Sequence, residues 1–172
     1  MLKRFVYLIL FCLSASTPQA QMREQEANLK AAFIYNFINY IDWDAGNNNN
    51  DFIIGIVGSS DVTKSLIDFS KGKTAKDKKI IVRVFNRPED IENCQILFIP
   101  KNISFSLHSI LEKTDKGTLT ISEETGFAEQ GTALNFYIQN DKLKFEANIK
   151  AIDGAGLKAS SQLLKLAKIV NQ

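Results

Sequence analysis

Apolar residues in the first third of the chain recur at the spacing of a helix. By the i, i+3, i+4, i+7 rule, residues 23–40 place six side chains on one face: Leu29, Ala32, Phe33, Asn36, Phe37 and Tyr40. Ile34, Ile38 and Ile41 form a second apolar strip. A helix that is apolar around most of its circumference is normally buried on more than one side. The second strip is therefore a candidate interaction surface, for a partner protein or for a second copy of the chain.

Short apolar runs then alternate with helical segments. Residues 52–57 are continuously apolar, which is typical of a strand covered on both faces. The pattern predicts further strands at residues 80–85, 96–99 and 117–121, and helices at residues 62–69 and 103–113. Strands that alternate with helices favour a largely parallel sheet with helices on both faces.

The last third of the chain predicts a hairpin followed by helix. Apolar and polar residues alternate over residues 134–139 and again over 142–147, with Asn140 and Asp141 between the two runs. Residues 149–170 are expected to be helical, with an interruption at 154–156. The predicted fold class is α/β: a three-layer αβα sandwich whose largely parallel sheet has a C-terminal antiparallel hairpin at its edge.

The amino terminus has the layout of a secretory signal peptide. Lys3 and Arg4 precede an apolar run over residues 5–13, which is about half the ~20 residues that a membrane-spanning helix needs. Small and polar residues follow, and cleavage is expected close to Ala20. The predicted organisation is a signal peptide over residues 1–20 and one domain over residues 21–172, exported to the periplasm.

Charge and cysteine content narrow the classes of function. The 172 residues hold 21 Lys and Arg against 19 Asp and Glu, and removal of Lys3 and Arg4 makes these numbers equal. Such a chain has no electrostatic signature of a nucleic-acid-binding protein. With Cys12 in the predicted signal peptide, Cys94 is the single thiol of the exported chain, so no internal disulfide can form. Cys94 precedes an apolar run and is expected to be buried.

Candidate catalytic residues are few, and the prediction is that the protein is not an enzyme. His108 is the single histidine and has no G-x-S-x-G motif beside it. Glu123 and Glu124 follow a predicted strand, where a solvated pair is more common than an acid/base pair. One histidine and two cysteines exclude most metal sites. No cofactor or metal is expected.

The loop Gly58, Ser59, Ser60 and Asp61 is a candidate anion or ligand site. It follows a predicted buried strand and opens a helix, where free N–H groups and the helix dipole favour an anion. Ordinary capping by Ser60 or Asp61 is the alternative. Lys158, Lys165 and Lys168 are expected on one side of the last helix, either solvated or facing an acidic partner.

Three segments together resemble the YfiR family of periplasmic regulatory proteins. They are residues 29–37 (LKAAFIYNF) with Trp43, residues 94–99 (CQILFI), and the stretch from residues 126–131 (GFAEQG) through 145–148 (FEAN) to 156–164 (GLKASSQLL). Thr132 stands where the family often has a second glycine. Some members have disulfides, so redox control through an internal disulfide does not transfer to a chain with Cys94 alone.

The resemblance implies an exported α/β protein that represses a membrane-bound diguanylate cyclase through the periplasmic part of the cyclase. It also implies that an OmpA-like outer-membrane lipoprotein can sequester such a regulator. A homodimer is equally compatible with the second apolar strip. The alternative hypothesis is a periplasmic small-ligand sensor, or the binding domain of another signalling system such as a sensor kinase, using Gly58, Ser59 and Ser60.

Overall fold

The computed structural model describes residues 18–43 and 50–170. Residues 1–17 of the predicted signal peptide and residues 46–49 of the asparagine-rich stretch lie outside the described part of the chain. The predicted cleavage point after Ala20 falls in the first turn of helix α2 (Pro18–Phe37). None of the described helices combines the length and apolar content that crossing a membrane requires.

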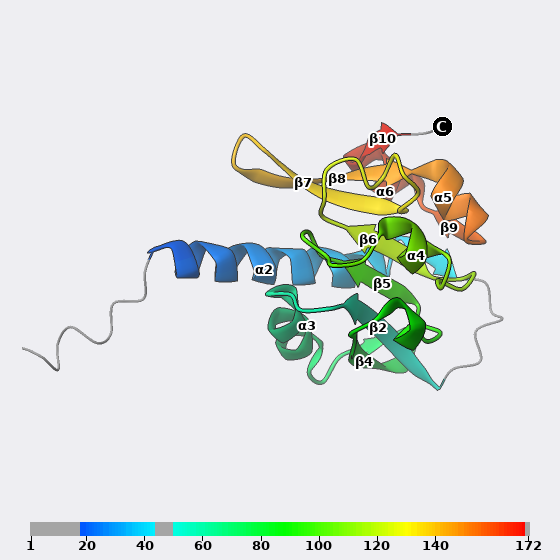
Figure 1. Cartoon of the computed structure of the whole chain (residues 1–172), viewed down its shortest axis with the longest axis horizontal. Coiled ribbons are helices and arrows are strands. Elements are labelled where there is room, and N and C mark those ends of the chain that lie inside the picture. Colours follow the sequence, from blue (N-terminus) through cyan, green and yellow to red (C-terminus); the bar gives the residue numbers. More distant parts are fainter. Residues whose placement is uncertain (1–17, 44–49, 171–172) are drawn as a thin grey trace, which may run out of the picture.

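The main sheet is mixed and mostly parallel (Figure 1). In the described residues it has eight strands in the order β10-β8-β7-β6-β5-β2-β4-β3. Its central strands are β2 (Asp51–Val57), β5 (Ile96–Ile99), β6 (Leu119–Ser122) and β4 (Lys78–Phe85). All neighbours are parallel except the β3–β4 pair and the β7–β8 hairpin. The predicted α/β class with a largely parallel sheet is confirmed.

Two clusters of buried residues cover the two faces of β2. Phe52, Ile54 and Ile56 pack in the cluster that includes α2 and α3 (Val62–Ser70). Ile53 and Val57, which alternate with them, pack with α4 (Leu107–Leu111) on the opposite face. The continuous apolar run of β2 thus reflects burial on both faces, as expected for a central parallel strand.

The second apolar strip of the first helix is not on the surface. Ile34, Ile38 and Ile41 are at most 2% exposed and belong to the core beneath the sheet. The strip they form with Ala27 and Ala31 is the one that faces the sheet, and Leu29 on the expected packing face is 46% exposed. The prediction that Ile34, Ile38 and Ile41 form an interaction surface is therefore wrong, because these side chains are buried in the core.

The hairpin is confirmed, although it is not the edge of the sheet. Strands β7 (Leu134–Gln139) and β8 (Lys142–Asn148) pair across Asn140 and Asp141, which have φ angles of 51° and 56°. Positive φ at both central residues is what a type I′ hairpin turn requires. Beyond β8 lies the short edge strand β10 (Lys168–Val170), which pairs parallel to it.

The expected C-terminal helix is replaced by alternating short elements. They are α5 (Ile149–Gly154), β9 (Leu157–Ala159), α6 (Ser161–Leu166) and β10. Gly156, with a φ of 75°, ends the first helix, and the Ser160 side chain caps the second by accepting from the Leu163 N–H at 3.2 Å. Strand β9 pairs with β1 (Ile41–Trp43) in a separate two-stranded sheet. Lys158, Lys165 and Lys168 consequently lie on three elements.

The remaining described elements are β3 (Thr74–Ala75) and a 3₁₀ turn over Pro88–Asp90. Cys94 is a free, buried thiol just before β5. Burial raises the pKa of this thiol to about 12. Since the thiolate is the reactive form, burial disfavours reaction at Cys94 in the folded protein.

Substitution of Gly55 is a test of the close packing around β2. A Cβ at this position would lie 2.5 Å from a ring atom of Phe85. Gly55→Ala is therefore expected to cost about 1–3 kcal/mol of unfolding free energy, measured by urea denaturation. The control is Gly154→Ala in α5, where a Cβ meets nothing within 4 Å and the change should be neutral or slightly stabilising. Equal stability of both variants would contradict this description of the core.

Candidate functional site at the carboxyl ends of the strands

The chain reverses its direction of travel across the sheet between β2 and β5. From β2 it passes through α3 to β4 on one side, whereas β5 and β6 lie on the other side. In open α/β sheets, ligands bind outside the carboxyl ends of the strands at such a switch point. The loops at this position are residues 58–61 after β2, residues 100–102 after β5 and Glu123 after β6.

The loop after β2 is held in place by its own backbone. Gly58 has a φ of 68°, and its N–H donates to the Phe85 carbonyl at 2.8 Å. The Ser60 hydroxyl accepts the Val62 N–H at 3.1 Å, while Asp61 makes no such side-chain bond. The capping alternative is thus realised by Ser60, and Ser59 keeps an exposed side chain.

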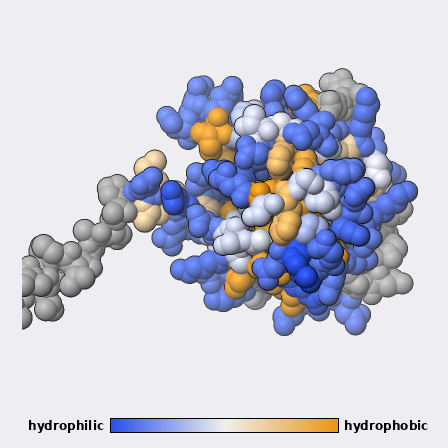
Figure 2. All heavy atoms as spheres, in the orientation of Figure 1, coloured by the Kyte–Doolittle hydropathy of each residue, from blue (hydrophilic) through white to orange (hydrophobic). Residues whose placement is uncertain are grey.

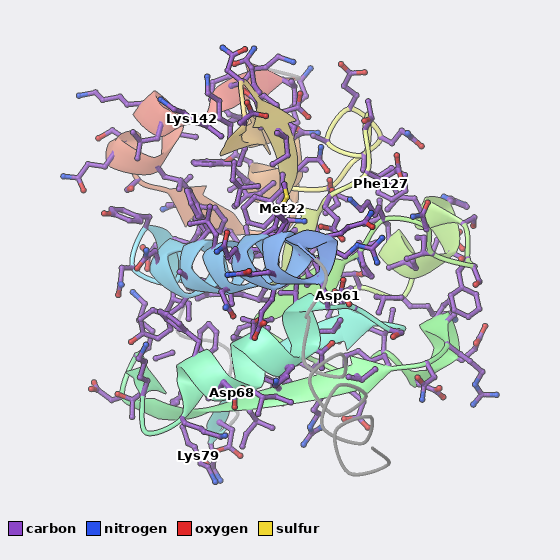
Figure 3. All side chains as sticks on the ribbon, turned by 90° about the vertical axis from the view of Figure 1, so that its left-hand side faces the viewer. Met22, Asp61, Asp68, Lys79, Phe127 and Lys142 are labelled. Atoms are coloured by element: carbon purple, nitrogen blue, oxygen red, sulfur yellow. The ribbon has the colours of Figure 1, made fainter. Side chains whose placement is uncertain are left out.

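A cavity of about 340 Å³ lies between this loop and α2. Its lining includes Ser59 and Ser60 from the loop, Lys101 and Asn102 after β5, and Arg23 and Lys30 on α2. Gly58 is not part of this lining; it borders a neighbouring cavity with Ser59 and Lys101. Figure 3, which views this end of the molecule, shows Asp61 at the start of α3 beneath the end of α2.

The floor of the cavity is a buried ion cluster. The Lys30 ammonium donates to Glu123 and lies 2.5 Å from a carboxylate oxygen of Glu26, one helical turn before it. The side chains of Lys30 and Glu123 are 7% and 9% exposed. The Lys101 N–H donates to the other oxygen of Glu123 at 3.2 Å. The cluster therefore joins α2 to the ends of β5 and β6.

Lys30 and Glu26 are ionised at neutral pH. Burial alone would lower the pKa of Lys30, but its hydrogen bonds to Glu123 and Glu26 outweigh burial and raise it. The hydrogen bond from Lys30 also lowers the pKa of Glu26. Both groups hold their charges because each is paired, which is the condition for burying charge in a protein.

The sequence interpretation missed Lys30 and assigned Glu123 to solvent. The available signal was the position of Lys30 on the same helical strip as Ala27, Ala31 and Ile34, where a lysine needs a buried partner. Glu123 is separated from Lys30 by 93 positions, so no local pattern pairs the two residues.

The other candidates lie elsewhere. His108 is largely exposed on α4 and lies 3.1 Å from Glu112 on the next turn. Glu124 accepts the N–H of Thr125. Within residues 18–43 and 50–170, no group of three or more His, Cys, Asp or Glu side chains is placed to hold a metal ion.

Comparison with protein families defines the class. The model of the YfiR/HmsC-like family matches residues 27–168, which is most of the chain and nearly all of the described fold. The chain belongs to the YfiR/HmsC-like family. Among curated proteins, none matches it.

The ion cluster is open to a double-mutant test. Lys30→Met should lower the unfolding free energy by about 3–5 kcal/mol, since it leaves the buried Glu123 carboxylate unpaired. Combining it with Glu123→Gln should cost less than the sum of the two single changes, because no buried charge is left unpaired and Glu26, whose side chain is 38% exposed, remains accessible to water. Urea denaturation of all four proteins measures the coupling.

The matched control is Lys71→Met, which removes an exposed ion pair with Asp68. No measurable loss of stability is expected there. A Lys30→Met variant as stable as this control would show that the cluster does not hold α2 on the sheet.

Proposed function

We propose that this protein is an exported, non-enzymatic regulator that restrains a membrane-bound diguanylate cyclase by contact with the cyclase's periplasmic part. The family match over residues 27–168 is the observation that supports this proposal. The predicted signal peptide over residues 1–20 supplies the route to the periplasm. Residues 21–172 then form the single regulatory domain, and its sequestration by an OmpA-like lipoprotein, which frees the cyclase, completes the proposed switch.

Contact with a partner needs exposed apolar side chains, and the exposed ones are spread over several elements. Figure 2 shows a mostly hydrophilic face with hydrophobic residues interspersed. Leu29 on α2 and Ile138 on β7 are 46% and 54% exposed. Both side chains adjoin the contact between Phe33 of α2 and Phe136 of β7, whose ring centroids are 6.0 Å apart. Leu29 lies one helical turn before Phe33. Ile138 lies two residues after Phe136, on the same face of β7. The exposed side chains of Leu29 and Ile138 are the proposed contact surface for the cyclase.

Deletion of the gene is expected to raise cyclic di-GMP and surface adhesion in a host that has a cognate cyclase with a periplasmic part. Loss of a restraining protein releases the cyclase, and expression of the wild-type protein should reverse the effect. Cyclic di-GMP is measured in cell extracts of the deletion strain, the complemented strain and a strain that also lacks the cyclase. Unchanged cyclic di-GMP despite the cyclase would favour the small-ligand sensor.

Charge placed on the proposed contact surface should have the effect of deletion without unfolding the protein. The variant is Leu29→Glu with Ile138→Lys, and it is assayed by complementation and by binding to the purified periplasmic part of the cyclase. Truncating or charging an interface anchor typically weakens binding by about 2 kcal/mol or more, roughly thirtyfold. Ile67→Glu, on the similarly exposed Ile67 of α3, is the control. If both folded variants keep full affinity, the contact surface lies elsewhere.

A further inference from the structure

We propose that the cavity beside Lys30 binds a small organic anion that carries a carboxylate or phosphate group. The site is separate from the proposed contact surface, and the proposal does not depend on the identity of the partner. It rests on the polar groups that line one cavity and on the position of that cavity at the carboxyl ends of β2, β5 and β6.

The lining holds three cationic side chains and three carboxylates, but two of the carboxylates are bound by Lys30. Arg23 and Lys101 bring two exposed cationic groups to the cavity, and Ser59, Ser60 and Asn102 add hydroxyl and amide groups. Lys30 has three N–H donors, of which Glu26 and Glu123 account for two. A ligand that accepts several hydrogen bonds and has a negative charge fits this set.

The carboxylates of the lining do not make it a cation site. Glu26 and Glu123 are already bound by Lys30, and Glu123 also accepts the Lys101 N–H. Asp61 adds one further negative charge to the lining. Because that charge opposes the anion, the geometry points to a ligand whose acidic group lies on the side of Arg23 and Lys101.

The space available fits an organic anion better than an inorganic ion. The cavity of about 340 Å³ falls within the range of small-molecule sites, roughly 300–1,000 Å³. A second cavity of about 560 Å³ between α2 and α3 shares Arg23, Ala27, Ser60 and Asp61 with it. The body of a ligand can extend in that direction while its acidic group stays near Lys101.

The test is a titration of the purified protein, followed by ¹⁵N–¹H NMR at constant pH and ionic strength. The probes are succinate for the carboxylate class, glycerol 3-phosphate for the phosphate class, and glycerol as the uncharged control. We expect at least one of the two anions to shift the backbone amide signals of Ser59, Ser60 and Lys101 saturably. Which anion does so identifies the acidic group that the site prefers.

Paired variants separate this site from general attraction to positive charge. Arg23→Gln with Lys101→Gln should weaken the apparent affinity about tenfold or more, since charged hydrogen bonds are lost. Lys113→Gln with Lys150→Gln removes the same charge from exposed positions outside the cavity lining and should leave the affinity unchanged.

Three results would overturn the proposal: no saturable shift with either anion, equal shifts with glycerol, or equal weakening in both variant pairs. None of them bears on the cyclic di-GMP measurement in the deletion strain. Failure of the anion site and failure of the proposed regulatory function are therefore distinguishable.

Discussion

The ion cluster in which the buried Lys30 and Glu123 meet the partly exposed Glu26 is the contact on which the placement of the first helix depends. Helix α2 packs on the sheet through Ala27, Ala31 and the isoleucines that follow, but apolar packing alone tolerates sliding and rotation. The buried Lys30 ammonium does not allow such movement, because separating it from its carboxylate partners costs free energy. The cluster therefore fixes the register of α2 against the ends of β5 and β6.

That register determines the shape of the surface at the switch point. Glu26 and Arg23 lie one and two turns before Lys30 on the same side of α2, so they are brought over the loops that follow β2 and β5. The cavity exists because the helix is held above those loops by Lys30 while Ser60 caps α3 below. Removing the cluster would alter the lining of the cavity without changing the topology of the sheet.

The sequence predicted the elements whose signals are local. The continuous apolar run of β2 and the Asn140-Asp141 turn each specify their structure over a few residues, and both were confirmed. Burial of α2 on more than one side was predicted correctly, since Phe37 of the first strip and Ile34 of the second are both buried, but the second strip was wrongly expected to offer an interaction surface. The strands β9 and β10 are three residues each, and they form only because β1 and β8 are available to pair.

In the candidate site too, the parts with a local sequence signal were predicted and the long-range pairing was not. Gly58 to Ser60 was predicted as a ligand loop from its place after a buried strand, and the structure puts Ser59 and Ser60 in a cavity lining. The partner of the lysine opposite them could not be assigned from sequence, because Glu123 is distant in the chain and stands beside Glu124 in what reads as a solvated pair. Pairing of charges that are distant in the chain depends on the fold, and local sequence patterns do not predict it.

Helix α2 contributes both to the cavity and to the proposed contact surface. Lys30 faces the ion cluster, while the adjacent Leu29 points away from the core and remains exposed. A ligand that draws Arg23 or Lys30 toward it acts on the same rigid helix that presents Leu29. Any coupling between the two sites must be reciprocal in free energy: an anion that weakens partner binding is itself bound more weakly by the complex, by the same factor. Comparing anion affinity in the free protein and in the complex would therefore measure the regulatory effect of the ligand without a cellular assay.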